Sequence, residues 1–137
     1  MKKLLPILLL SILFFPGCKK AVENALDDAI LKSMTDGQWV ITNFTENGKD
    51  ITPDFSGYKF QYHSNKTVDA IKNGMIEHSG VWDGSTVNKT TWAEFSGVER
   101  PLLLLNGTWK ITNNTLTYVK ASQATDSGIK TFRLDKQ

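Results

Sequence analysis

The stretch Gly37-Gln38-Trp39-Val40-Ile41-Thr42 decides how the fold of this 137-residue chain is interpreted. Its pattern returns near the carboxyl end as Gly107-Thr108-Trp109-Lys110-Ile111-Thr112, and Gly80-Val81-Trp82 lies between the two copies. β-Branched and aromatic residues surround each copy, which is typical of strands. The three segments are therefore predicted to be strands of one antiparallel all-β domain, with their tryptophans pointing into a shared interior.

Short strands separated by turn residues follow from Trp39 to the end of the chain. In Gly57–His63 the aromatic residues Tyr58, Phe60 and Tyr62 alternate with polar ones, which is the period of a half-buried strand. The segments between turn signals give roughly nine strands, each joined to the next by a short turn or loop. Such a meander must hide its edges, so residues 37–137 are predicted to form an up-and-down antiparallel barrel, or a flattened barrel, of about eight or nine strands.

Two local expectations concern the middle of this domain. Thr91–Phe95 and Pro101–Leu105 are interpreted as strands. Because Leu102–Leu105 lacks polar alternation, that strand is expected to be covered on both faces, with an amino-terminal helix as one cover.

The carboxyl end carries further expectations. Gly107–Thr112 and Thr115–Lys120 are predicted to form a hairpin around Asn113-Asn114, since asparagine tolerates the positive φ that tight turns need. Ala121–Gly128 has no pattern, and a mobile loop is expected there. The residues predicted to point into the barrel are Trp109, Ile111, Leu116, Tyr118, Phe132 and Leu134.

Lys19–Met34 is the segment with helical periodicity. Apolar residues recur at spacings of three and four, which predicts one apolar stripe: Ala21, Val22, Ala25, Leu26, Ala29, Ile30 and Met34. Asp36-Gly37 ends the pattern. The region 18–36 could act as a spacer from a membrane, or its stripe could cap one end of the β-domain; we favour the cap.

The first 17 residues are interpreted as a signal segment. Lys2 and Lys3 precede the apolar run Leu4–Phe15, which is shorter than the roughly 20 residues that span a bilayer. Cys18 directly follows Gly17, and this arrangement resembles the lipobox of bacterial lipoproteins, with Phe15 in place of the usual leucine.

The lipobox resemblance implies that diacylglycerol is attached to the Cys18 sulfur, that the chain is cleaved after Gly17 and that the new amino terminus is acylated. Several acyl chains would hold the protein stably on a membrane. Lys19 and Lys20, and no acidic run, follow the cysteine, so the outer membrane facing the periplasm is the expected location. The alternative is a free or buried thiol in a secreted protein; a disulfide framework is excluded because Cys18 is the only cysteine.

Composition narrows the function further. The whole chain has 16 basic and 14 acidic residues, and removal of Lys2 and Lys3 would leave it neutral. A neutral chain without a basic cluster argues against a nucleic-acid partner. The remainder has the length of one domain with a real core, and a monomer is assumed.

Together these features resemble the lipocalin-like lipoproteins of Bacteroidetes-type bacteria, over Gly37 to the end of the chain. In lipocalins a Gly-x-Trp opens the first strand and its tryptophan plugs the closed end of the barrel; Gly37-Gln38-Trp39 stands in that place, so Trp39 is the expected plug. Lipocalins also lay an arginine of the last strand across this tryptophan. Arg133 is the candidate here, although its parity is opposite to that of Phe132 and Leu134.

The lipocalin resemblance implies a cup that holds a small apolar ligand. The candidate lining is aromatic: Tyr58, Phe60, Tyr62, Trp82, Trp92, Trp109 and Tyr118. The same side chains could instead fill the core, because a barrel of about eight strands is just wide enough for either outcome. An interior pocket of about 300 Å³ or more would favour ligand binding, and a filled interior would favour an interaction role.

Catalytic and metal-binding patterns are weak. His63 and His78 are the only histidines, and Glu77 lies beside His78. A metal site needs three or four converging ligands, and no third converging ligand is evident. We therefore interpret both histidines as exposed strand residues. No nucleophile elbow, phosphate-binding loop or zinc-protease motif occurs. We therefore expect no enzyme, cofactor or metal.

The first functional hypothesis is a membrane-tethered binding module for a small hydrophobic or amphiphilic molecule in the cell envelope. The second is a lipoprotein with a filled barrel whose loops contact another envelope protein.

Overall fold

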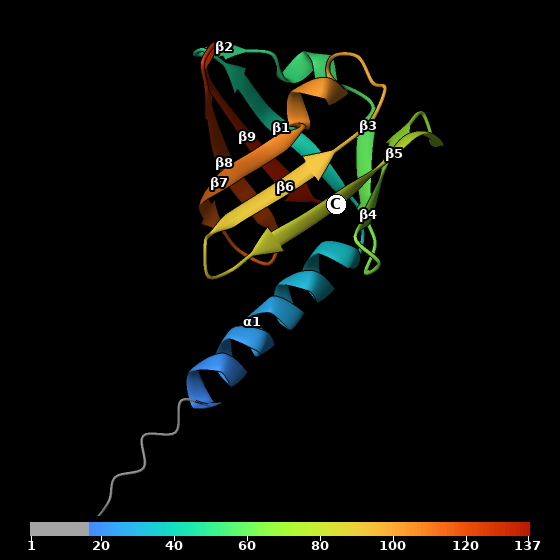
Figure 1. The fold of residues 1–137 in the computed structure, drawn as a ribbon. Helices are drawn as coiled ribbons and strands as arrows, with labels where there is room; N and C mark the ends of the chain where they lie inside the picture. The colour runs from blue at the N-terminus through green and yellow to red at the C-terminus, as the bar shows by residue number, and fades with distance from the viewer. Residues whose placement is uncertain (1–16) are drawn as a thin grey trace, which may run out of the picture.

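The computed structural model describes residues 17–137, so the predicted signal segment, apart from Gly17, lies outside the described residues. Within this range one helix precedes an antiparallel sheet with two short 3-10 helices (Figure 1). The elements are α1 (Gly17–Thr35), β1 (Trp39–Glu46), β2 (Lys49–Asp50), η1 (Thr52–Phe55), β3 (Tyr58–Tyr62), β4 (Thr67–Lys72), β5 (Met75–Ser85), β6 (Thr90–Glu94), η2 (Leu102–Leu105), β7 (Gly107–Asn114), β8 (Tyr118–Thr125) and β9 (Gly128–Lys136).

The sheet closes on itself, which confirms the predicted antiparallel barrel. The strand order is β2-β1-β3-β4-β5-β6-β7-β8-β9, and β1 also pairs with β9. Eight strands therefore form the barrel, and the short β2 is an addition to β1. The β1–β9 ladder has seven registered pairs, from Trp39↔Lys136 to Glu46↔Lys130, whereas β1 and β3 share the single pair Trp39↔Phe60.

η1 and η2 lie at one end of the barrel, at the top in Figure 1, and Phe55, Leu102 and Leu104 of these helices are buried there. Phe44 stacks on Phe55 with ring centroids 4.8 Å apart, and the edge of Trp109 meets Phe44 at 6.0 Å. This buried apolar surface stabilises one end of the core, which continues along the barrel to Trp39 and Met34.

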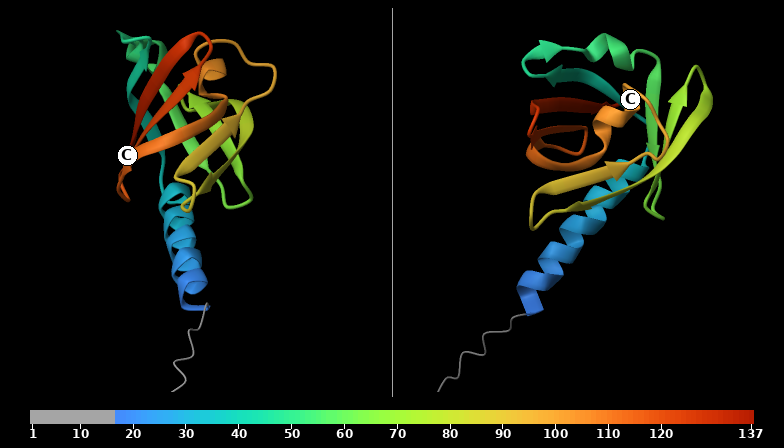
Figure 2. Two further views of the ribbon diagram at one scale, coloured as in Figure 1. Left: turned by 60° about the vertical axis from the view of Figure 1, so that its left-hand side comes forward. Right: turned by 45° about the horizontal axis from the view of Figure 1, so that its top comes forward.

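α1 lies at the opposite end of the barrel. Its last two turns pack Ile30, Leu31 and Met34 against the core, while Val22 and Leu26 are 60 % and 52 % exposed. In Figures 1 and 2 the amino-terminal end of α1 extends away from the barrel. The carboxyl-terminal turns of α1 therefore cap this end of the barrel, and the amino-terminal turns do not. Among residues 17–137, no helix has the length and apolarity needed to cross a membrane.

The interpretation of Pro101–Leu105 as a strand is wrong. Leu102–Leu105 is the 3-10 helix η2, with the N–H of Leu104 donating to the Pro101 carbonyl at 3.0 Å. Leu102 and Leu104 are buried and Leu103 is 50 % exposed, so the short helix mimics the alternation of a strand. The expected cover by the amino-terminal helix is also wrong, because α1 lies at the other end.

The loop expected at Ala121–Gly128 is instead a hairpin. β8 runs to Thr125 and β9 starts at Gly128, with Ala121↔Phe132 and Thr125↔Gly128 in register. Ala121 is 2 % exposed, so a small residue occupies an inward position opposite a large one. The polar residues after it hid this strand from a search for apolar alternation.

The β7–β8 turn lies two residues later than predicted. Asn113 and Asn114 are still in β7, and the turn is Thr115–Thr117. The Thr115 hydroxyl accepts hydrogen bonds from the N–H groups of Thr117 (3.1 Å) and Tyr118 (3.3 Å), the local bonding that stabilises such turns. The inward parity given to Leu116 and Tyr118 is consequently wrong.

Candidate ligand cavity

A cavity of about 730 Å³ lies inside the barrel and opens beside α1. Its volume falls in the usual range for small-molecule sites, roughly 300–1,000 Å³. The apolar part of its barrel wall combines aliphatic and aromatic side chains: Ile41, Phe60, Tyr62, Val68, Trp82, Ala93, Phe95, Leu105, Trp109, Ile111, Val119, Phe132 and Leu134. Polar and charged residues, among them Asp27, Lys66, Asp83, Lys89 and Asn113, also line it. Leu26, Ile30, Leu31 and Met34 of α1 form a further wall.

Trp109 forms the deep end of the cavity. Its ring meets Phe132 edge-on at 4.7 Å, and its Nε1–H donates to the Leu105 carbonyl at 2.9 Å. The Lys130 Nζ lies 5.2 Å from the Trp109 ring centroid and donates to the Leu104 carbonyl at 2.9 Å. Desolvation lowers the pKa of Lys130. These contacts fix the indole between the cavity and the η1–η2 end of the barrel.

Tyr62 and Trp82 form the wall near the opening. Their rings meet edge-on at 5.0 Å, and Trp82 Nε1–H donates to the His63 carbonyl at 3.2 Å. The Lys66 Nζ lies 5.2 Å from the Trp82 ring centroid and 3.0 Å from an Asp83 carboxylate oxygen. An aromatic wall thus gives way to a polar rim.

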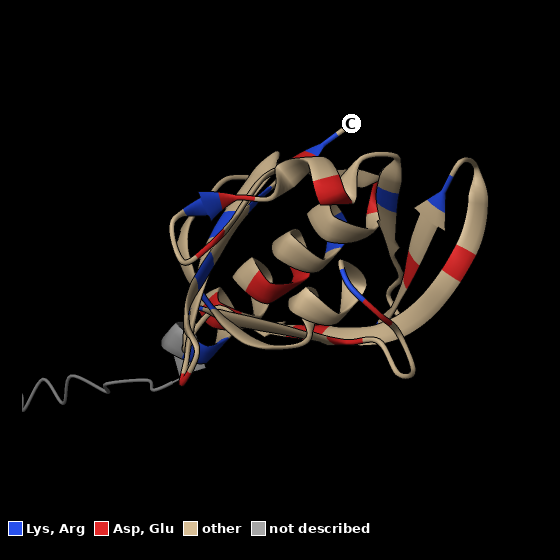
Figure 3. Cartoon of the chain, turned by 90° about the horizontal axis from the view of Figure 1, so that it is seen from above, with Lys and Arg blue, Asp and Glu red and all other residues tan. Residues whose placement is uncertain are grey.

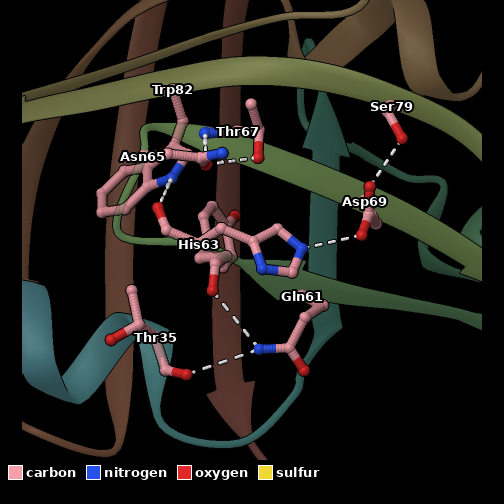
Figure 4. A network of polar contacts seen from close by, with 9 residues as sticks. Thr35, Gln61, His63, Asn65, Thr67, Asp69, Ser79 and Trp82 are labelled. Carbon is pink, nitrogen blue, oxygen red and sulfur yellow. Dashed lines mark hydrogen bonds and ion pairs between the residues drawn. The ribbon is translucent and has the colours of Figure 1, made fainter.

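A hydrogen-bond network holds the β3–β4 turn behind this wall (Figure 4). The Asn65 side-chain oxygen accepts from the Thr67 N–H at 3.1 Å and from its hydroxyl at 2.6 Å. Gln61 Nε2 donates to the Thr35 carbonyl at 3.4 Å, which ties β3 to the end of α1. The network positions the Tyr62–Trp82 pair.

Two side-chain hydrogen bonds attach α1 to loops at the opening. The Thr86 hydroxyl, in the β5–β6 turn, donates to Asp27 Oδ1 at 2.5 Å. The Ser33 hydroxyl donates to the Leu116 carbonyl, in the β7–β8 turn, at 2.6 Å. The helix therefore bridges two sides of the opening.

Four of the seven aromatic residues predicted as lining do line the cavity on inward positions: Phe60, Tyr62, Trp82 and Trp109. Trp92 borders it but is 39 % exposed, and it pairs with Asp83 and Thr108 on the outward parity. Trp92 is therefore a rim residue at most.

Tyr58 and Tyr118 are not among the lining residues. Tyr58 is buried nearer the η1–η2 end, with the Lys72 Nζ 4.8 Å from its ring centroid, and burial raises the pKa of its hydroxyl to about 12. Tyr118 lies on the outer face, where the Arg133 guanidinium stacks 4.4 Å from its ring centroid. Because the β7–β8 turn lies later than predicted, the prediction chose the wrong residues of β8 as inward-facing. Val119 and Ala121 point inward instead.

Trp39 is fully buried but does not plug a closed end. Its Nε1–H donates to the Met34 carbonyl at 3.0 Å, because only three residues separate the end of α1 from β1 and both lie at the open end of the barrel. The Lys136 Nζ lies 5.5 Å from the Trp39 ring centroid. Arg133 does not reach Trp39; it points outward, as its parity predicts, and binds Asp135 at 2.8 Å. Trp39 therefore attaches the helix rather than sealing the far end.

His63, Asp69 and Ser79 form a polar cluster on the outside of the barrel (Figure 4). His63 Nε2 lies 2.7 Å from Asp69 Oδ2, and the Ser79 hydroxyl donates to Asp69 Oδ1 at 2.5 Å. Both bonds lower the pKa of Asp69, the Ser79 bond more strongly. The aspartate stands between the other two side chains, whereas a catalytic triad needs the histidine there. Among residues 17–137, no three metal-ligating side chains converge.

The helix wall and the two phenylalanines Phe95 and Phe132 were missing from the predicted lining. The apolar stripe of α1 and the inward parity of Phe132 were the available signals. Phe95 follows β6 directly and is 2 % exposed. Charged residues of both signs are interspersed over the ribbon (Figure 3).

The fold and the site define a small closed antiparallel barrel with an internal cavity. A solved structure of a DUF4847 family protein from Bacteroides vulgatus has a similar fold, with a TM-score of 0.54 and 11 % sequence identity. The match covers 79 % of this chain and 99 % of that chain. At this identity the likeness concerns the fold alone. No family model matches the chain, and no curated protein does.

Proposed function

We propose that this protein is a membrane-anchored, lipocalin-like lipoprotein that holds a small hydrophobic or amphiphilic molecule in its barrel. The observation that carries the proposal is the cavity of about 730 Å³ with its aromatic wall. A molecule that fills it buries apolar surface at roughly 25 cal/mol per Å². The alternative, an interaction lipoprotein with a filled barrel, requires an interior that its own side chains occupy.

The proposed anchor is Cys18, at the start of α1. α1 reaches the barrel at Asp27, which accepts a hydrogen bond from Thr86. A helix rises about 1.5 Å per residue, so the stretch from Cys18 to Asp27 would set the barrel about 14 Å from the anchored end. We place the protein on the outer membrane facing the periplasm, with no catalytic role, no cofactor and no nucleic-acid partner.

Native mass spectrometry of the purified protein tests the binding function. We expect a second species whose added mass dissociates on mild activation and which extraction identifies as an apolar or amphiphilic molecule. Trp109→Ala should reduce its fraction, while Tyr118→Ala, on the outer face, should leave it unchanged. A protein that shows only the bare mass, and that binds no added apolar probe, would contradict the proposal.

Metabolic labelling with palmitate tests the anchor. The wild-type protein should incorporate label and fractionate with membranes, and Cys18→Ser should do neither, because the acyl acceptor sulfur is gone. Label that persists in Cys18→Ser would rule out this cysteine as the attachment site.

A further inference from the structure

Three basic residues that lie apart in the sequence come together on the outer face of the wall formed by β7, β8 and β9 (Figure 1). Lys120 of β8 is directly opposite Arg133 of β9. Lys110 of β7 is opposite Ser122 of β8, two residues further along that strand. Like charges directly opposite on antiparallel strands destabilise a sheet. The arrangement therefore costs stability unless other groups compensate its charge.

Asp135 compensates one of these charges. Its carboxylate accepts hydrogen bonds from Nε and Nη2 of Arg133 at 2.8 and 2.9 Å, and this contact is the main cause of its lowered pKa. The ring of Tyr118 stacks on the same guanidinium. Among residues 17–137, neither Lys110 nor Lys120 forms an ion pair. The face therefore keeps an excess of positive charge beside a guanidinium that is already held in place.

A hollow of about 260 Å³ lies on this outer face. None of its lining residues is acidic, and six of them carry side-chain hydrogen-bond donors: Asn43, Thr112, Lys120, Ala121, Ser122, Thr131, Phe132 and Arg133. Thr112 and Phe132 also border the barrel cavity, but the other six residues do not. The hollow is therefore a site of its own, polar where the cavity wall is aromatic and aliphatic.

Two β-bulges border the hollow. The pairing of β1 with β9 shifts register between Ile41 and Asn43, and the pairing of β7 with β8 shifts between Ile111 and Asn113. A bulge bends its strand and changes the direction of side chains next to it. Asn43 directly follows the first shift, and Thr112 lies within the second; both line the hollow. The bulges thus help to gather donors from four strands around one space.

Several of these donors are available to a ligand. Among residues 17–137, the side chains of Asn43, Lys120 and Ser122 make no hydrogen bond, and Nη1 of Arg133 makes none because its contacts to Asp135 use Nε and Nη2. Hydrogen bonds from charged donors to an anion are stronger than neutral ones. A guanidinium that is already fixed also loses little conformational freedom when it binds.

We propose that this hollow binds a tetrahedral oxyanion, a phosphate or sulfate group, between Lys120 and Arg133. This site goes beyond the function proposed above and does not depend on it. A phosphate monoester carries a charge of roughly −1.5 to −2 at pH 7, which matches the two cations. Asn43 and Ser122 donate to its remaining oxygens. A free phosphorylated molecule and a phospholipid headgroup share this chemistry.

An NMR titration of the purified full chain tests the inference. Inorganic phosphate or sulfate replaces chloride at constant ionic strength, and the amide signals of residues 120–122 and 131–133 should shift and saturate. Lys120→Gln should weaken this binding about threefold to tenfold, the effect of one partly exposed contact between a cation and an anion. Lys59→Gln, which removes the same charge from β3, is the matched control and should change nothing.

Thermal unfolding without phosphate checks that both variants fold. Lys120→Gln should be at least as stable as the wild type, because it removes the charge opposite Arg133. Glycerol phosphate and a short-chain phosphatidic acid, titrated separately, distinguish the two sources of the group. Tighter binding of either one at the same amide signals supports the inference and identifies the source.

Two results would overturn the proposed oxyanion site. In the first, neither phosphate nor sulfate shifts the signals of residues 120–122 and 131–133 relative to chloride. In the second, Lys120→Gln and Lys59→Gln weaken phosphate binding equally, which would mean that the overall charge of the chain and not the hollow attracts the anion. The ligand cavity inside the barrel would be unaffected by either result, since native mass spectrometry tests it separately.

Discussion

Trp39 combines full burial with two specific contacts in one side chain. It is fully buried, donates to Met34 of α1 and lies under the Lys136 Nζ. Trp39→Ala should therefore lower the free energy of unfolding by about 3–5 kcal/mol, as for other large buried aromatic residues. Chemical denaturation measures the change.

Trp92→Ala is the matched control for that substitution. Trp92 is 39 % exposed, and its replacement should cost clearly less than that of Trp39. Equal losses for the two variants would show that Trp39 has no special place in the structure.

Gly80 is the glycine of the middle Gly-x-Trp segment, and its role is steric. A Cβ at this position would collide with the backbone carbonyl of Glu94 and lie 2.9 Å from Phe95 Cδ1. A Cβ at Gly84, in the same strand, would meet only the Thr90 carbonyl at 3.5 Å. Gly80→Ala should destabilise the protein by about 1–3 kcal/mol, and Gly84→Ala should be near neutral. Thermal unfolding compares them, and a stable Gly80→Ala would contradict the close approach of β5 and β6.

At the scale of elements, α1 is predicted to be unevenly stable. Its last two turns pack on the core, and its first turns carry exposed apolar side chains. Amide hydrogen exchange should therefore be fast over residues 20–26 and slow over residues 30–35, because local opening costs little where few contacts are lost. Mass spectrometry of peptides from the two halves gives both rates. Uniform protection along the helix would mean that its amino-terminal half has a packing partner.

The sequence correctly predicted those elements in which the spacing of apolar residues matches the side that faces the core. Tyr58, Phe60 and Tyr62 alternate because β3 faces the core on one side. The apolar stripe predicted for α1 holds only in part, because Ile30 and Met34 are docked whereas Val22 and Leu26 are exposed. Leu102–Leu105 was misassigned because a short run of four apolar residues does not distinguish a covered strand from a single 3-10 turn. Tyr118 was misplaced because the register shift in β7 between Ile111 and Asn113 and the later turn change which residues face inward. One inserted residue exchanges the two faces of a strand.

For the whole molecule, the sequence predicted closure of the sheet but left the interior open to two outcomes. Whether side chains fill a barrel of eight strands depends on how they pack in three dimensions, and the spacing of residues along the chain does not determine this packing. Here Phe44, Phe55 and Trp109 gather at one end. Space remains at the other end, bounded by α1.

The long ladder between β1 and β9 sets the order in which this barrel can assemble. β1 is synthesised first but cannot complete its pairing until β9 has been synthesised, because seven of its registered partners lie in β9. Contacts so distant along the chain slow folding. A chain that stops before Gly128 would leave β1 and β8 with unsatisfied edges and should aggregate rather than fold.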